Sequence, residues 1–230
     1  MKKPVDFKWK HYEQEIILLA VRWYLRYSLS YQDLVEMMEE RGLSISHTTI
    51  MRWVHRYGSE LDKRVRRHLK KTNASWRVDE TYIKVKGKWM YLYRAVDSGG
   101  NTVDFYLSKN RKAKSAKRFF KKALASCHTS KPRVLTVDKN PAYPKAVKQS
   151  QKAGIKFRQM KYLNNIVEQD HRFIKKRVRY ILGFQSFHTA TKTLAGIEAM
   201  HMIRKGHTFH GEKSVQKQIQ LINILFGLTA

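Results

Sequence analysis

The apolar residues of the first 60 positions recur at the spacing of amphipathic helices. One stripe runs from residue 12 to residue 27, and a second helix is predicted from Ser30, a capping residue, to about Gly42. Ser46 can cap a third helix, in which an apolar stripe comprises Ile50, Trp53, Val54 and Tyr57. Three short helices with a tight link are typical of a helix-turn-helix domain.

The third predicted helix has a polar and basic face opposite its apolar stripe. A face of this kind suits the major groove of DNA, but most amphipathic helices also have a solvated polar face. The pattern therefore allows both a recognition helix and an ordinary exposed helix. The candidate DNA contacts on this face are His47, Thr48, Thr49, Arg52 and Arg56.

From residue 76 onward, β-branched and aromatic residues predominate. Residues 76–85 and 89–96 flank a short turn that contains Gly87, and this pattern predicts a hairpin. Residues 102–107 predict a third antiparallel strand, and residues 134–137 predict a later, short apolar strand. These strands point to a single sheet.

Helices are predicted between and after the strands. One spans residues 113–124 and has a lysine-rich outer face. Others are predicted from Asn140 to about residue 153, from Asn165 onward, and from Ser186 to about residue 205. The order of elements predicts an α/β fold, an α+β mixed sheet flanked by helices. A last amphipathic segment includes Val215, Ile219, Ile222 and Phe226.

The charge of the chain indicates its partner. Its 230 residues include 47 lysines and arginines and only 18 acidic residues, for a formal charge of +29. Such self-repulsion destabilises a compact protein unless a polyanion neutralises it, so nucleic acid is the expected partner. A solvated basic surface or an anionic membrane surface is the alternative, and charge alone does not separate DNA from RNA.

Cysteine content and hydropathy favour a cytoplasmic protein. The single cysteine, Cys127, excludes an intrachain disulfide and a cysteine-rich zinc site, and we expect it to be a small buried residue. The basic N-terminus is not followed by the apolar segment of a signal peptide, and no stretch is long enough to span a bilayer.

Three carboxylates lie in or beside apolar segments, where a basic protein rarely places them without a reason. Asp79 lies within a predicted strand, Asp138 directly follows one, and Glu168 lies in the first turn of a predicted helix. Taken singly, each has a simpler explanation, as an outward strand residue, a turn residue or a helix-capping residue. Together they could hold two divalent ions about 3.5–4 Å apart, an arrangement that catalyses phosphodiester chemistry.

The helix that carries Glu168 also carries a basic track at positions i+4, i+7 and i+11. Two interpretations fit this spacing. The basic side chains can form ion pairs within the helix, or they can contact DNA phosphate beside a bound metal. The track comprises Arg172, Lys175 and Arg179, and Asp170 and His171 are candidates for supporting the metal ligands.

Three segments occur in a characteristic order: WRVDETY at residues 76–82, VDK at residues 137–139 and YLNNIVEQDH at residues 162–171. Together they resemble the DDE transposases of short bacterial insertion sequences, and the resemblance extends from the Ser46 helix to about Gly206. It implies an RNase H-like integrase core in which Asp79, Asp138 and Glu168 are the catalytic and metal-binding acids.

The resemblance also implies cofactor, partners and reaction. Two Mg²⁺ ions would occupy the site, with Mn²⁺ able to substitute. The partners would be double-stranded DNA, both the element's terminal inverted repeats and the target, and further copies of the chain in a homodimer or higher oligomer. A strand at the element's end would be hydrolysed, and its 3′-hydroxyl would attack target DNA. The protein would lie in the bacterial cytoplasm, on the nucleoid.

Lys175 matches the basic residue that family members carry seven positions after the glutamate. The other DNA contacts expected around the core are Lys139, Arg172, Lys176 and Arg179, and Asn165 joins Asp170 and His171 as a supporting residue. We predict a helix-turn-helix domain over residues 1–72, a catalytic core over residues 73–206 and an amphipathic tail over residues 207–230.

One feature departs from the family pattern. Only 29 residues separate Asp138 from Glu168, fewer than is usual, and we expect the shortening in a loop at residues 154–160. The alternatives are a nuclease of the same core that cuts without joining, a tyrosine recombinase, and a DNA-binding regulator whose acids only cap helices and turns.

Overall fold

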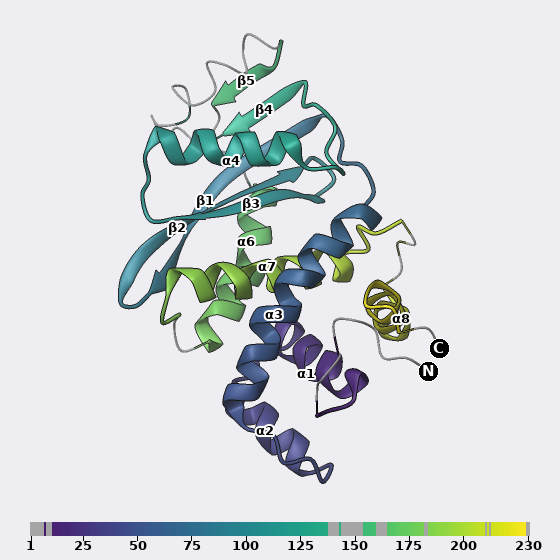
Figure 1. Ribbon diagram of the computed structural model, residues 1–230. Coiled ribbons are helices and arrows are strands. Elements are labelled where there is room, and N and C mark those ends of the chain that lie inside the picture. Colours follow the sequence, from purple (N-terminus) through teal and green to yellow (C-terminus); the bar gives the residue numbers. More distant parts are fainter. Residues whose placement is uncertain are drawn as a thin grey trace. The chain divides into compact units, whose positions relative to one another are not determined.

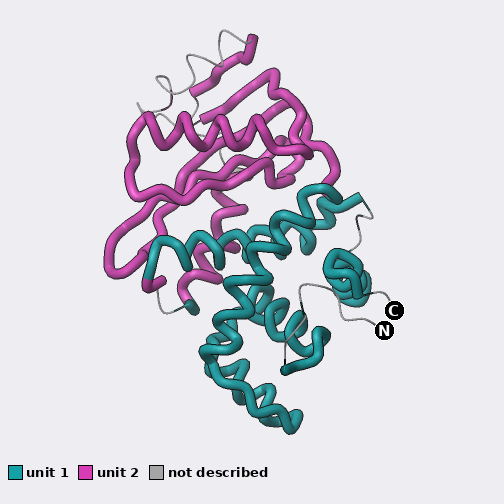
Figure 2. The backbone as a smooth tube through the Cα atoms, in the orientation of Figure 1, with its two compact units in different colours: residues 1–68, 180–182, 186–230 teal, residues 69–179, 183–185 magenta. Residues whose placement is uncertain are grey.

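The computed structural model describes residue 7 and residues 11–137, 143, 154–159, 165–181, 184–209, 211 and 213–228. The chain divides into two compact units (Figure 2). Unit 1 comprises residues 1–68, 180–182 and 186–230, and unit 2 comprises residues 69–179 and 183–185. Each unit is described by itself.

Unit 1 is helical. Its first three helices, α1 (Gln14–Arg26), α2 (Tyr31–Glu39) and α3 (His47–Val65), lie where the apolar stripes predicted them. Ser30 and Ser46 cap α2 and α3 as expected, because each side chain accepts a hydrogen bond from a backbone N–H in the first turn. A short 3-10 turn, Arg66–His68, follows α3.

Helix α7 (Phe187–Arg204) packs against α1 and α3 within unit 1. Ala190, Leu194, Ile197 and Met200, which recur at helical spacing, are buried, and residues on the other sides of the helix are buried too. The contact with α3 is close, because a Cβ at Gly196 would lie 2.9 Å from the Cα of Gly58. A side chain at Gly196 would therefore force the two helices apart.

Helix α8 (Val215–Leu225) also belongs to unit 1, where it contacts α1 and α3. Ile222 and Phe226 of the predicted tail stripe are buried, whereas Val215 is exposed. The tail is thus part of a packed unit. Residues 186–206, which the sequence analysis includes in the catalytic core, pack with the N-terminal helices in unit 1. The compact units therefore do not follow the predicted domain boundaries.

The described strands of unit 2 form one sheet in the order β3-β2-β1-β4-β5 (Figure 1). β1 (Ser75–Val85), β2 (Lys88–Asp97) and β3 (Thr102–Ser108) are antiparallel, as predicted. β4 (Val134–Val137) and β5 (Lys156–Gln159) run parallel to β1. This mixed order is that of an RNase H-like fold.

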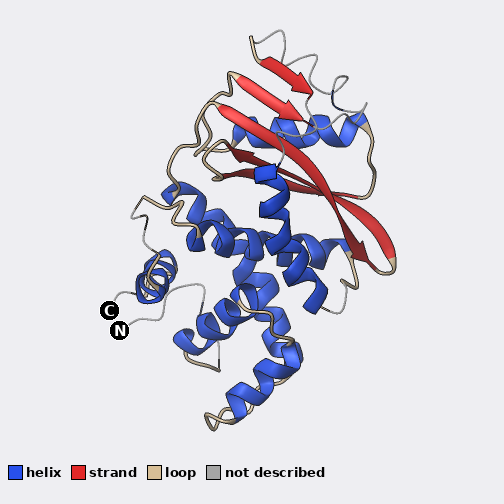
Figure 3. Cartoon of the chain, turned by 180° about the vertical axis from the view of Figure 1, so that it is seen from behind, coloured by secondary structure: helices blue, strands red, loops and turns tan. Residues whose placement is uncertain are grey.

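Two helices lie on opposite faces of this sheet (Figures 1 and 3). Helix α4 (Ala113–Ala125) covers the face that holds the apolar core of unit 2. Helix α6 (Asn165–Tyr180) lies on the other face and begins where the sequence predicts it. The helix predicted over residues 140–153 lies outside the described residues, apart from the fully buried Tyr143.

Two expectations were wrong. Residues 156–159, predicted to lie in a loop, form the edge strand β5. The apolar pattern did not indicate a strand there, because Phe157 is its one apolar residue. Cys127 is exposed rather than buried, because it follows the end of α4 in a surface turn. None of the helices in the described part of the chain has the length and apolar character needed to traverse a lipid bilayer.

Candidate active site

Asp79 lies in the middle of β1, on the face of the sheet that α6 covers. The alternation of strand residues produces this placement: Trp76 and Val78 enter the core beneath α4, so Asp79 points to the opposite side. Its side chain is 16% exposed and lies beside His171 of α6. The carboxylate is therefore held in place by the fold while remaining accessible to solvent.

The imidazole of His171 lies beside Asp79, with its Nδ1 3.6 Å from Asp79 Oδ2. Burial, reinforced by the positive charge of Arg94, lowers the pKa of His171 to about 3. The ring is thus neutral at physiological pH, and it does not neutralise the neighbouring carboxylate.

A buried ion pair fastens α6 to the sheet next to Asp79. Arg94 is the cross-strand partner of Asp79 on β2, is fully buried, and places its Nη2 2.6 Å from Asp170 Oδ2. A charge-assisted hydrogen bond of this length in a water-excluded setting is strong and directional. The pair fixes the position of α6 one residue before His171.

Glu168 lies on α6 one helical turn before His171, and its side chain is exposed. Residues three apart on a helix share a side, so Glu168 projects on the side of α6 that carries the His171 contact to Asp79. Asp138 and Lys139 lie outside the described residues. β4, which precedes them in sequence, ends at Val137, whose partner in β1 is Val78, the residue before Asp79.

The chemistry of these groups fits a divalent cation. Asp79 and Glu168 offer accessible carboxylate oxygens, the ligands that Mg²⁺ and Mn²⁺ prefer. Within the described residues no group of three acidic, histidine or cysteine side chains converges as a metal site. A complete site would need the third acid, Asp138.

Comparison with known proteins places this geometry in a family. The model of a DDE domain matches residues 73–207. The transposase of the insertion sequence-like element IS431mec from Staphylococcus aureus is 42% identical over 205 residues, which span 86% of this chain and 88% of that protein. The transposase of the element IS257 in transposon Tn4003, also from Staphylococcus aureus, is similar to the same extent.

The chain belongs to the DDE transposases of bacterial insertion sequences. The transposase is accordingly a metal-dependent polynucleotidyl transferase with an RNase H-like core. Among solved structures, the HTLV-2 integrase catalytic core domain aligns with a TM-score of 0.46 at 19% identity, over 55% of this chain and 84% of that one. The BIV integrase catalytic core aligns with a TM-score of 0.44 at 18% identity, over 54% and 81%.

The basic track predicted on α6 of the transposase is exposed. Arg172, Lys175, Lys176 and Arg179 all have exposed side chains, whereas Val167 and Ile174 on the other side of the helix are fully buried. Of the predicted supporting residues, Asp170 pairs with Arg94 and His171 contacts Asp79. The side chain of Asn165 lies outside the described residues.

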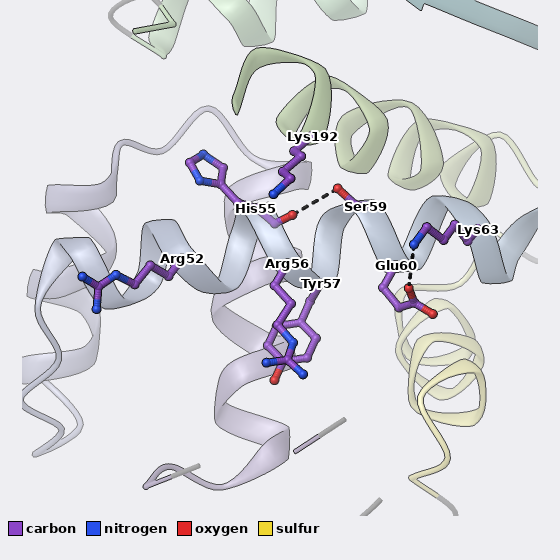
Figure 4. A pocket seen from close by; sticks show the side chains of 8 residues that line it. All are labelled: Arg52, His55, Arg56, Tyr57, Ser59, Glu60, Lys63 and Lys192. Carbon is purple, nitrogen blue, oxygen red and sulfur yellow. Dashed lines mark hydrogen bonds and ion pairs between the residues drawn. The ribbon is translucent and has the colours of Figure 1, made fainter. Parts of the chain in front are cut away.

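The predicted recognition face of α3 is also exposed at His47, Thr48, Arg52 and Arg56, with Thr49 half-buried. The hydroxyls of Thr48 and Thr49 lie 3.0 and 2.9 Å from the Ser46 Oγ, so both take part in the cap of the helix. Further along α3, Arg52 and Arg56 line a groove together with Lys63 and with Lys192 of α7 (Figure 4). Burial and Lys192 lower the pKa of His55 in this groove.

The sequence reasoning missed two groups near the site. Arg94 stands in the otherwise apolar run YLYRAV, and a charge in such a strand signals a buried partner. Glu80, next to Asp79, points to the α4 side, where it pairs with Arg111 and accepts a hydrogen bond of 3.0 Å from the hydroxyl of Tyr143. Adjacent carboxylates thus enter different environments.

Proposed function

We propose that this transposase binds the ends of its insertion sequence, hydrolyses a phosphodiester there to free a 3′-hydroxyl, and joins that hydroxyl to target DNA. The observation that carries the proposal is geometric: the accessible carboxylate of Asp79 lies beside His171 of α6, and Glu168 lies one helical turn before His171 on the same helix. Catalysis and metal binding are assigned to Asp79, Asp138 and Glu168.

Two Mg²⁺ ions bound by these acids, or Mn²⁺ in their place, would activate the attacking oxygen and stabilise the leaving oxygen. The fold of the chain holds the proposed metal ligands in position. Asp79 is fixed by its strand, and Glu168 by the helix that the Arg94–Asp170 pair holds to the sheet.

The reaction consists of two in-line displacements at phosphorus. In the first, a water oxygen forms a bond to phosphorus, the bond from phosphorus to the 3′-oxygen breaks, and that oxygen takes up a proton as the freed 3′-hydroxyl. In the second, this hydroxyl loses its proton and attacks a target phosphodiester, whose own 3′-oxygen leaves. The bonds made and broken balance, so no nucleotide cofactor is needed.

DNA binding is assigned to two sets of residues. On α3 they are His47, Thr48, Thr49, Arg52 and Arg56, which would contact the element's terminal inverted repeat. On and near α6 they are Lys139, Arg172, Lys175, Lys176 and Arg179, which would contact phosphates beside the reacting strand. Asn165, Asp170 and His171 would support the metal ligands.

Two copies of the chain would act together on DNA. Joining both ends of an element requires two active sites when each site processes one end, so we propose a homodimer or a higher oligomer on double-stranded DNA. A fully active end complex that contains one copy would contradict this.

Strand transfer tests the proposal. A labelled DNA with the element's own ends is incubated with a plasmid and Mg²⁺, with wild type, Asp79→Asn and Asp97→Asn in parallel. Asp97 is a carboxylate of the same sheet that accepts hydrogen bonds from the backbone N–H groups of Gly99 and Asn101, so its variant should lose stability and keep joining.

We expect joining by wild type and by folded Asp97→Asn, and DNA binding without cleavage or joining by Asp79→Asn. Cleavage without joining by wild type would indicate a nuclease. Binding without either reaction would indicate a regulator. Joining by Asp79→Asn at the wild-type rate would remove Asp79 from the active site.

A further inference from the structure

The hairpin formed by β1 and β2 exposes aromatic rings that the reaction described above does not use. Trp89 is 61% exposed and Tyr82 is 47% exposed, although both lie in regular strands. Single exposed apolar side chains need no explanation, but exposed ones that form a contiguous patch often mark an interaction site. The turn of this hairpin projects beyond α4, which covers the rest of the same face (Figures 1 and 3).

The exposed rings share one face of the hairpin. Tyr82 is the cross-strand partner of Tyr91, and Lys84 is the partner of Trp89. The ring of Tyr82 lies 5.4 Å from that of Tyr91 and 6.3 Å from that of Trp89, between centroids. The four side chains Tyr82, Lys84, Trp89 and Tyr91 thus form a continuous surface, which we term the aromatic–lysine face.

The opposite face of the hairpin accounts for its stability. Ile83 and Val85 are buried there, Val85 forms a β-bridge with Phe184, and the backbone N–H of Lys86 donates to the carbonyl of Phe184. Lys86 and Gly87 both adopt positive φ, of 46° and 75°, in a tight two-residue turn. The rings are therefore not needed to fill the core, and they are presented on a defined scaffold.

The charged residues of the hairpin between Glu80 and Asp97 are all basic. Lys84, Lys86 and Lys88 are exposed, and no acidic residue occurs between Glu80 and Asp97 in the sequence. The Nζ of Lys84 lies 5.9 Å from the centre of the Trp89 ring. Such a surface repels a second copy of itself, so its charge favours a polyanion over self-association.

We propose that the aromatic–lysine face binds a single-stranded stretch of DNA. Unpaired bases would stack on Trp89 and Tyr82, and Lys84 and the turn residue Lys86 would contact the backbone phosphates. In a duplex the bases already stack on one another, so exposed ring faces offer little to intact double-stranded DNA. The inference rests on the proposed function, in which DNA ends are opened and joined, and the strand could come from the element or the target.

The test measures binding by the full-length chain to a fluorescent single-stranded oligothymidine and to a fluorescent duplex of unrelated sequence. Trp89→Ala is expected to weaken single-strand binding about tenfold or more, because stacking on an aromatic ring contributes that much per base. Duplex binding should change less than about twofold. Trp89→Phe keeps a stacking surface and should restore most of the loss.

Two controls separate the proposal from other causes. Phe209→Ala removes an equally exposed aromatic ring elsewhere, since Phe209 is 62% exposed, and it should affect neither ligand. The pair Lys84→Gln and Lys86→Gln, combined in one chain, should reduce the salt dependence of single-strand binding by about two phosphate contacts.

Equal weakening of single-strand and duplex binding by Trp89→Ala would overturn the proposal, and so would no change in either. A change in oligomeric state by sedimentation velocity, with single-strand binding intact, would assign the face to protein contacts instead. Asp79→Asn should bind the oligothymidine like wild type, so a failure of the catalytic assignment would leave this result standing.

Discussion

The two faces of the sheet in unit 2 arise from alternate residues of the same strands, yet they differ in chemistry. The α4 face holds an apolar core that includes Trp76, Val78 and Phe119. The α6 face holds Asp79, Arg94 and their helical partners, and it contains a fully buried guanidinium. Burying charge contributes little to stability even when it is paired, whereas burying apolar surface contributes much. The α4 face therefore stabilises the unit, and the α6 face carries the proposed active site.

Asp79 and Glu80 show this contrast within two residues. Glu80 enters the α4 side, where Arg111 and the hydroxyl of Tyr143 satisfy its oxygens. Asp79 enters the α6 side, where it lies beside the neutral imidazole of His171. Adjacent strand positions face opposite ways, so one carboxylate becomes structural and the other becomes available to a cation.

The largest effect is expected from breaking the buried pair on the α6 face. Arg94→Met leaves Asp170 without the guanidinium that compensates its charge and should cost about 3–5 kcal/mol of unfolding free energy. Strand transfer by the folded fraction should fall about 100-fold or more, because small displacements of catalytic groups have effects of that size. Urea unfolding and strand transfer measure the two effects.

The double variant Arg94→Met with Asp170→Leu is the control for this experiment. It removes both charges, so stability should return toward wild type while strand transfer stays low. Recovery of strand transfer together with stability would show that the pair has no positioning role.

The α4 face should respond in the opposite way. Phe119→Ala removes a fully buried ring and should cost about 3–5 kcal/mol, while strand transfer per folded molecule stays at the wild-type level. Leu124→Ala on the same helix, at a position that is 41% exposed, should change stability by less than about 0.5 kcal/mol. A large drop in the activity of folded Phe119→Ala would contradict the division of roles between the faces.

Two tyrosines on the α4 face should differ when each loses its hydroxyl. Tyr143→Phe removes a hydrogen bond to the buried carboxylate of Glu80 and should cost about 1–3 kcal/mol. The hydroxyl of Tyr93 is buried and has no hydrogen-bond partner among the described residues, so Tyr93→Phe should be neutral within about 0.5 kcal/mol. Equal effects of the two changes in urea unfolding would refute this difference.

The smallest effect concerns alkaline pH. Burial, and then the charge of Glu80, raises the pKa of Tyr93 above that of an unfolded tyrosine. Its contribution to stability is complete below about pH 10 and is lost as the pH rises further, by up to about 1.4 kcal/mol per pH unit. Urea unfolding of Tyr93→Phe between about pH 9 and 11 should show a shallower loss than wild type. The exposed Tyr180, changed to Phe, should leave the slope unaltered.

The sequence alone determined the elements with local signals and the family of the chain. Ser30, Ser46 and Ser186 cap the helices they were predicted to cap, because capping depends on a few adjacent residues. The turn at Lys86 and Gly87 formed the predicted hairpin for the same reason. The motifs around Asp79, Asp138 and Glu168 led to a family that the comparisons establish.

Only the tertiary structure decided which residues meet across the sheet. The partner of Arg94, the neutral state of His171 and the contrast between Asp79 and Glu80 depend on residues distant in sequence. The edge strand β5 could not be predicted from its polar composition. An edge strand is defined by hydrogen bonds to a neighbouring strand rather than by burial. Local propensities specify elements, whereas long-range packing specifies the charge and access of each side chain.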